Sequence, residues 1–147
     1  MTVNGLLQNT SKYSPILQAT FGLERESLRI NQENKVAQTN HPDKLGNRSF
    51  HPYIQTDYSE AQIELITPIG KTTQDALRTL GAITDVAGRS INQDEYLWPL
   101  SMPPKLGKDD IHIAKLDDAW ERQYRKHLAE SYGKILQSMS GIHYNVE

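Results

Sequence analysis

The sequence contains no cysteine, and this absence excludes disulfide bonds, thiolate metal sites and a cysteine nucleophile. It also has no excess of charge of one sign, since 16 Lys and Arg stand against 18 Asp and Glu. A basic surface of the kind that binds nucleic acid is therefore not expected. No apolar run is long enough to span a membrane, and the N-terminal residues do not follow the pattern of a secretory signal. These absences favour one soluble, cytoplasmic domain with no nucleic-acid or membrane partner, and 147 residues can bury a sizeable core.

Two glutamates stand one residue apart in the segment FGLERESLRI, residues 21–30, whose sequence otherwise predicts a strand. Residues i and i+2 of a strand lie on the same face, about 7 Å apart. The carboxylates of Glu24 and Glu26 would therefore repel each other, which indicates a positive group between or above them. The alternative is a solvated face, on which these charges pair with Arg25, Arg29 or a lysine across a hairpin.

Turn and strand signals continue on both sides of this segment. A short amphipathic piece is predicted around Leu6, Leu7, Ile16 and Leu17. The turn signal NQENK and the following VAQTN (36–40) predict a β-hairpin with residues 21–30. Two His-Pro pairs and a glycine indicate a loop over residues 41–52. Residues 61–67 then predict a strand with Ile63 and Leu65 on one face and Gln62, Glu64 and Ile66 on the other.

Two helices are predicted in the second half of the chain. Thr72 and Asp75 resemble a helix N-terminus, and apolar residues then recur at helical spacing: Ala76, Leu77, Leu80, Ile83, Val86, Ala87 and Ile91. The proline-rich segment 97–107 follows. Residues 117–131 predict a second helix, whose stripe of Trp120, Tyr124 and Leu128 is more often core than a substrate wall. Strands separated by helices and irregular segments favour an α+β fold.

Oxygen and imidazole side chains occur on three of the predicted strand segments. They are Glu24 and Glu26, then Asp57, Glu60 and Glu64, and finally His143 and Asn145 at i, i+2 in the last predicted strand, ILQSMSGIHYNV. Carboxylates of this kind are typical ligands of Mg²⁺, and an imidazole can join them most readily with Mn²⁺. The structural alternatives are a solvated carboxylate at Glu60, on a turn, and a hydrogen-bonded structural histidine at His143. The residues alone therefore indicate a carboxylate-rich sheet face that can bind a divalent metal.

Four segments in the same order and with similar spacing resemble the opening region of glutamate–cysteine ligases. They are FGLERESLRI, HPYIQTDYSEAQIELITP, DEYLWPLSMPP and SGIHYN, and the resemblance runs from about Pro15 to Asn145. It is closest to the bifunctional enzymes of glutathione synthesis, in which an ATP-grasp synthetase follows the ligase. The resemblance implies a glutamine synthetase and guanido kinase type of fold, with a curved antiparallel sheet over the active site. Because the family's ligase domain is several times longer, residues 1–147 are expected to be its N-terminal part, without an internal boundary and inactive alone.

The implied reaction is the ATP-dependent joining of the γ-carboxylate of glutamate to the amine of cysteine, through a γ-glutamyl phosphate. The family pattern implies that Mg²⁺ is bound by Glu24, Glu26, Asp57, Glu64 and His143. It also implies that Tyr58 and Tyr124 form the wall of the cysteine pocket, that Gln137 and Asn145 lie near glutamate, and that Arg125 lies near the phosphates.

Two other functions compete with this one. The first is a metal- or nucleotide-binding remnant that does not catalyse. The second is a guanido-substrate phosphotransferase of the same fold group, which the ligase-like motifs disfavour.

Overall fold

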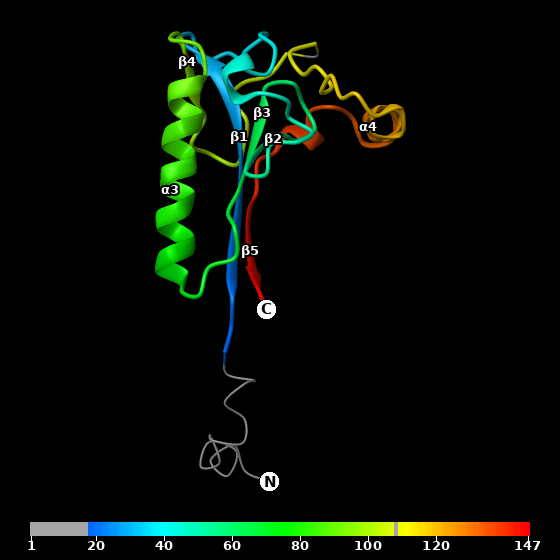
Figure 1. The fold of residues 1–147 in the computed structure, drawn as a ribbon. Helices are drawn as coiled ribbons and strands as arrows, with labels where there is room; N and C mark the ends of the chain where they lie inside the picture. The colour runs from blue at the N-terminus through cyan, green and yellow to red at the C-terminus, as the bar shows by residue number, and fades with distance from the viewer. Residues whose placement is uncertain (1–17, 108) are drawn as a thin grey trace.

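The computed structural model describes residues 18–107 and 109–147, so the amphipathic piece predicted around Leu6 to Leu17 lies outside the described residues. The elements follow one another in the order β-β-β-α-β-α-β, as Figure 1 shows. They are β1 (Phe21–Asn31), β2 (Ile54–Thr56), β3 (Gln62–Ile66), α3 (Thr73–Ser90), β4 (Glu95–Leu97), α4 (Ala119–Tyr132) and β5 (Ile142–Val146), with 3-10 turns η2 (Asp43–Leu45) and η3 (Leu136–Ser138). The α+β class predicted from the sequence is confirmed.

All strand pairs in the described part of the chain are antiparallel, and the long strand β1 is the centre of the sheet. One edge of β1 pairs with β3, and β2 follows on the far side of β3. The other edge pairs with β5 over the first half of β1 and with β4 over its last residues. Strands from distant parts of the sequence therefore meet on β1 (Figure 1).

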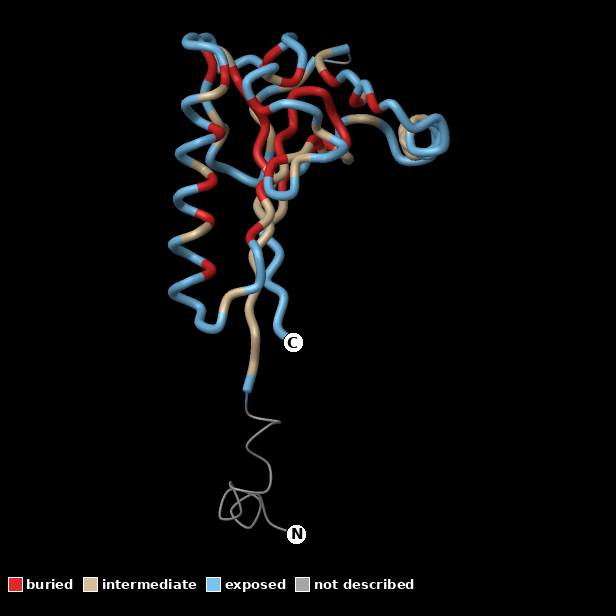
Figure 2. Tube along the Cα trace, viewed as in Figure 1, coloured by how far each residue is buried: buried red, intermediate tan, exposed pale blue. Residues whose placement is uncertain are grey.

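Helix α3 covers one face of this sheet, and Figure 2 shows its buried residues turned toward the strands. The Thr72 side chain accepts a hydrogen bond from the Asp75 N–H at 3.1 Å, which confirms the predicted N-cap. The helix buries Ala76, Leu80, Ile83 and Ala87, and three of these pack with Ile63 and Leu65 of β3. Leu77 and Val86 were expected on the same apolar face, but they lie on the solvent side and are 65% and 53% exposed.

The opposite face of the sheet holds a second apolar cluster at the far end of β1. Its buried members are Leu28, Val36, Tyr58, Ala61 and Ile111. Helix α4 begins at its N-cap Asp118 and buries none of its residues, although Leu128 and Ala129 pack partly against this cluster. The expectation that Trp120 and Tyr124 are core residues is wrong, since they are 73% and 50% exposed.

Several predicted boundaries differ from the structure. The hairpin is reduced to one bridge between Ile30 and Val36, and beyond Ala37 the Thr39 hydroxyl and carbonyl accept hydrogen bonds from the Arg29 side chain. The last strand is shorter than predicted, since Leu136–Ser138 form a 3-10 turn. The short strands β2 and β4 were not predicted, because three residues carry too little periodicity. None of the helices described here is long and apolar enough to cross a membrane.

Candidate active site

Four carboxylates and one histidine lie on the sheet face opposite α3. Glu26 stands directly across from Glu64 of β3, and Glu24 directly across from His143 of β5. Residues directly opposite each other in adjacent strands point to the same face, and Leu23, which alternates with Glu24, packs on the α3 side. Asp57 follows β2 and lies close enough for its charge to interact with those of Glu26 and His143. The predicted sharing of one face by these five side chains is therefore present in the structure.

Hydrogen bonds hold β5 and β1 together through these side chains. Glu26 accepts a bond from the Gly141 N–H at 2.8 Å and lies 3.2 Å from His143 Nε2. The Asn145 amide donates to Glu24 at 3.2 Å. A Cβ on Gly141 would lie 2.8 Å from His143 Nε2, so a larger residue here would displace the imidazole from its present position beside Glu26.

The electrostatics of this face are those of uncompensated negative charge. Burial, followed by the charges of Asp57, Glu24 and Glu26, raises the pKa of Glu64 to about 7. Burial and the charge of Glu26 also raise the pKa of Asp57. Glu24, Asp57 and Glu64 make no ion pair with a lysine or arginine in the part of the chain described here. A cation placed among them would remove this repulsion.

The donor set fits a hard divalent cation. Carboxylate oxygens with one imidazole suit Mg²⁺ or Mn²⁺, and Mg²⁺ commonly takes only one or two protein carboxylates, with phosphate oxygens and water completing its shell. Within residues 18–107 and 109–147, no three His, Asp or Glu side chains are positioned to hold one ion by themselves. This arrangement agrees with an ion that is shared with a phosphate-bearing substrate.

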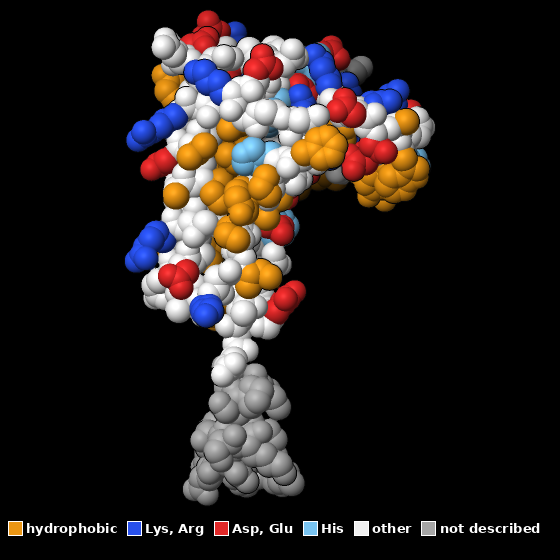
Figure 3. Space-filling model, viewed as in Figure 1, with side chains coloured by type: hydrophobic (Ala, Val, Ile, Leu, Met, Phe, Trp, Pro, Cys, Tyr) orange, Lys and Arg blue, Asp and Glu red, His pale blue; other side chains and the backbone are white. Residues whose placement is uncertain are grey.

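A cavity of about 490 Å³ lies between the carboxylates Glu26 and Asp57 and helix α4. Its lining residues come from β1, from the segment after β2, from α4 and from the turn η3. They are Glu26, Asp57, Tyr58, Trp120, Glu121, Tyr124, Arg125, Leu128, Leu136, Gln137 and Met139. The rings of Trp120 and Tyr124 stack at 5.6 Å between centroids, and Figure 3 shows an apolar patch on α4.

This cavity brings together four of the predicted substrate residues and separates a fifth from them. Tyr58, Tyr124, Arg125 and Gln137 all line it. The buried Tyr58 hydroxyl has no hydrogen-bond partner among the described residues. Asn145 instead lines a smaller cavity with Glu24 at the other end of β1, because it lies opposite Gly22 in the β1–β5 register.

Glu60 does not belong to this site, and its interpretation as a solvated carboxylate is wrong. Its side chain is buried, ion-pairs with Arg48 and accepts hydrogen bonds from the backbone N–H groups of His41 and Lys115. Although burial acts to raise its pKa, these hydrogen bonds and the Arg48 charge lower it to about 2. The sequence gives no local signal of this role, since Arg48 and Lys115 are brought to Glu60 only by the fold.

Trp120, Leu136 and Met139 are cavity residues that the sequence did not assign to a site. The signal for Trp120 was present in the aromatic stripe of α4, but an i, i+4 stripe is equally expected of a core helix. The structure separates the two cases because α4 buries no residue.

The sequence matches the family model described as glutamate-cysteine ligase over residues 5–147. It is 66% identical over 147 residues to a glutathione biosynthesis bifunctional protein of Streptococcus agalactiae and 63% identical over 148 residues to that of Streptococcus mutans. These matches cover 99% and 100% of this chain, but the chain spans only 20% of the length of either relative.

Two solved structures resemble this one closely. A bifunctional glutathione synthetase from Pasteurella multocida superposes with a TM-score of 0.88 at 43% identity, covering 96% of this chain and 19% of its own. A glutamate–cysteine ligase from Francisella tularensis, in complex with AMP, superposes with a TM-score of 0.86 at 35% identity, covering 88% of this chain and 27% of its own.

Proposed function

The chain belongs to the glutamate–cysteine ligase family, and we propose that its protein joins glutamate to cysteine in an ATP-dependent reaction. An oxygen of the glutamate γ-carboxylate attacks the γ-phosphorus of ATP, and ADP leaves. The amine of cysteine then attacks the resulting acyl phosphate, phosphate leaves, and the amine loses a proton to give γ-glutamylcysteine. We also propose that the sheet is part of a funnel of the glutamine synthetase type. Residues 1–147 would contribute the N-terminal part of this funnel.

One observation carries the proposal: a sheet face with four carboxylates and a histidine borders a cavity with an aromatic wall and an arginine. A reaction between a triphosphate and a carboxylate must overcome their mutual repulsion. Mg²⁺ ions, each held by one or two of Glu24, Glu26, Asp57, Glu64 and His143 with phosphate oxygens and water, would supply the positive charge that offsets it. The raised pKa of Glu64 supports this role, because it is caused by burial and then by the charges of neighbouring carboxylates, and a cation would offset both effects.

The other residues would bind and orient the substrates. Tyr58 and Tyr124 line the cavity together, and we assign them to the pocket for the cysteine side chain. Arg125 adds a positive charge for a phosphate, and Gln137 offers an amide to the bound glutamate. Asn145 would reach glutamate only from the Glu24 side of the face, since it lines the separate cavity there. We propose a cytoplasmic location for the protein, because the reaction needs a compartment supplied with ATP.

The substitution Glu24→Gln tests the metal assignment, because it removes the charge and keeps the shape. Loss of one strong metal contact to the transferred phosphoryl group should lower the rate of γ-glutamylcysteine formation about a hundredfold. The fold should change little, since Glu24 accepts one exposed hydrogen bond. The measurement is product formation by the full-length enzyme against Mg²⁺ concentration, with thermal melts of both proteins.

The matched control is Glu33→Gln, which removes a carboxylate from an exposed pair with Lys35 on the turn after β1. It should leave both rate and melting temperature unchanged. Near-normal turnover of Glu24→Gln at ordinary Mg²⁺ would refute the assignment. Binding of Mg²⁺ without any product would favour the non-catalytic remnant.

A further inference from the structure

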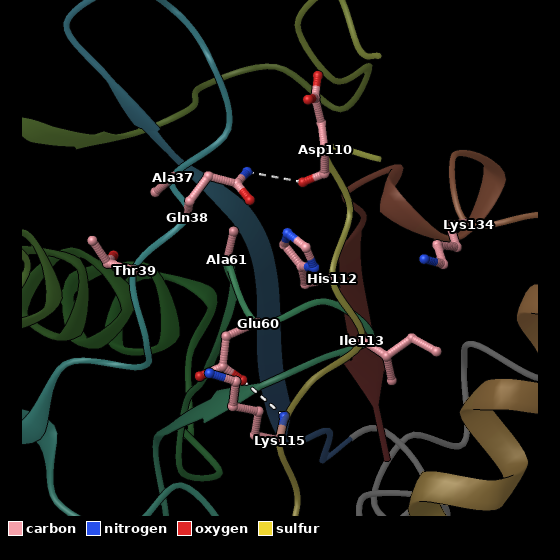
Figure 4. Close-up of a pocket in the computed structure, with 10 residues that line it drawn as sticks. All are labelled: Ala37, Gln38, Thr39, Glu60, Ala61, Asp110, His112, Ile113, Lys115 and Lys134. Carbon is pink, nitrogen blue, oxygen red and sulfur yellow. Dashed lines mark hydrogen bonds between the residues drawn. The ribbon is translucent and has the colours of Figure 1, made fainter. Parts of the chain in front are cut away.

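A second cavity, of about 430 Å³, shares no lining residue with the proposed active site. Its walls are the segment after the β1 turn, the turn before β3, the extended segment before α4, and Lys134, which follows the C-cap of α4 (Figure 4). The lining residues are Ala37, Gln38, Thr39, Glu60, Ala61, Asp110, His112, Ile113, Lys115 and Lys134. The ligase chemistry proposed above uses none of them.

The two carboxylates that line this cavity, Glu60 and Asp110, already accept hydrogen bonds from other groups of the protein. Both oxygens of Glu60 are engaged by Arg48, and each accepts a backbone N–H as well. The Asp110 carboxylate accepts the Gly107 N–H at 2.6 Å, and Figure 4 shows it turned away from the other lining residues. Glu60 is therefore paired with a cation, and the Asp110 carboxylate is directed away from the cavity.

Positive charge in the cavity is not compensated. Lys134 is half-buried, and no carboxylate of the described residues lies within ion-pair distance of it. Lys115 has a neutral partner, the amide oxygen of Asn40. In Figure 4 the Lys134 ammonium points toward the segment that carries His112 and Ile113. The two ammonium groups can therefore pair with an anion that enters the cavity.

The cavity is also held in shape without a ligand and has apolar walls. The Gln38 amide donates to the carbonyl groups of Val36 and Asp110, both at 3.0 Å, and so joins two of the walls. The Glu60 N–H donates to the His112 carbonyl at 2.8 Å and joins a third. Buried Ala37 and Ala61 form an apolar part of the lining.

We propose that this cavity binds a small organic anion, a carboxylate on a short apolar body. Lys134 holds the carboxylate, His112 donates a further hydrogen bond, and Lys115 adds to the positive potential. The apolar body lies against Ala37, Ala61 and Ile113. The site is separate from the carboxylate-rich face, which would repel such a ligand.

Titration of the full chain with succinate, followed by ¹H–¹⁵N NMR, tests the proposal. Shifts are expected at Gln38, Ala61, His112 and Lys134, and not at Glu24 or Glu64. Lys134→Gln should weaken succinate binding about tenfold, because it removes one charge-assisted contact. Lys71→Gln makes the same change of charge on an exposed lysine before α3 and should leave binding unchanged. Inorganic phosphate and the neutral diamide of succinate are the comparison ligands.

Binding of succinate over both comparison ligands, with loss only in Lys134→Gln, supports the proposal. If phosphate binds as tightly as succinate, the cavity does not recognise an apolar body. If the diamide binds as tightly as succinate, the cavity does not recognise a negative charge. If Lys71→Gln and Lys134→Gln weaken succinate binding equally, the ligand is attracted to surface lysines in general. If shifts are confined to residues of the cavity beside α4, the ligand binds in the proposed active site. Either result overturns the second site.

Discussion

Glu60 and Glu64 lie four residues apart, and their surroundings shift their pKa values in opposite directions. Glu60 is buried with Arg48 and two backbone N–H groups as partners, and its pKa falls to about 2. Burial and the neighbouring carboxylates raise the pKa of Glu64 to about 7. The partner, and not burial, decides the sign, because burial acts to raise both values.

Replacement of each glutamate by glutamine should therefore have opposite effects on the free energy of unfolding. At pH 8 without metal, Glu60→Gln should destabilise the protein by about 2 kcal/mol, since Arg48 loses its buried partner. Glu64→Gln should stabilise it by about 1 kcal/mol, since it removes a repulsion that solvent partly screens. Urea denaturation of both variants measures the two values.

The pH dependence separates these effects further. The stability that Glu60 contributes is present above about pH 4.5 and is lost as the pH falls toward 2, because its folded pKa is depressed. The Glu64 penalty is absent below about pH 4.5 and develops as the pH rises through 7, because its folded pKa is raised. A Glu64→Gln difference that is the same at pH 4 and pH 8 would contradict the repulsion argument.

Tyr124 should contribute to selection of the amine substrate. In the full-length enzyme, Tyr124→Ala should raise the KM for cysteine about tenfold and leave the KM for ATP unchanged, because the ring is part of the cavity wall. Tyr132→Ala is the matched control, since Tyr132 lies on the same helix, is 63% exposed and does not line the cavity. An unchanged KM for cysteine in Tyr124→Ala would remove this residue from the substrate pocket.

The two helices depend on different sources of stability. Helix α3 buries four apolar residues against the sheet, whereas α4 buries none and relies on partial contacts of Leu128 and Ala129. Most helix stability in proteins comes from packing of an apolar face, and short helices without it are marginal. Helix α4 carries Tyr124 and Arg125, so we expect this wall of the proposed substrate pocket to be less stable than the wall formed by β1.

Hydrogen exchange should show this difference directly. Amides of α3 should exchange only on global unfolding, whereas those of α4 should exchange through local opening. Asp118→Ala removes the N-cap bond to Glu121 N–H at 2.8 Å and should accelerate exchange in α4 without changing α3. Thr72→Ala, which removes the N-cap of α3, should lower global stability by about 1 kcal/mol and leave α3 protected. Equal protection of α3 and α4 would show that the partial contacts of α4 suffice.

At the scale of the whole molecule, Arg29 joins four segments that are distant in the sequence. Its guanidinium is fully buried and donates to Glu95 of β4 at 2.7 Å, to Thr39, and to the Glu60 carbonyl at 3.0 Å. Glu95 also accepts from Asn92 at 2.9 Å. Burial acts to raise the pKa of Glu95, but the hydrogen bonds from Thr39 and Asn92 and the Arg29 charge lower it. This network fixes the loop after β1 and the strand β4 on the central strand.

Removal of one charge from this network should therefore destabilise the entire fold. Arg29→Met leaves Glu95 buried without its partner and should cost about 3–5 kcal/mol of unfolding free energy. The double variant Arg29→Met with Glu95→Leu removes both charges and should recover a large part of that loss. The measurement is urea denaturation of both single variants and the double variant. A strictly additive double variant would show that the two side chains act independently.

The sequence by itself determined the elements whose signals are local. The period of two in residues 21–30 and 61–67 and the period of 3.6 after Thr72 are set by backbone geometry, so β1, β3 and α3 were predicted. The same period of two placed Glu24 with Glu26, and His143 with Asn145, on shared faces. The α+β class followed from the order of these elements.

Only the tertiary structure decided which of those faces meet. The register of β1 with β3 and β5 brings Glu26 opposite Glu64 and Glu24 opposite His143, and no local pattern fixes a pairing between residues 38 or more positions apart. The fold also decided that Glu60 is buried and that the aromatic residues of α4 are exposed, because burial depends on what packs against a residue. A carboxylate's charge and hydrogen-bonding capacity are local properties, but its pKa depends on neighbours that folding brings to it.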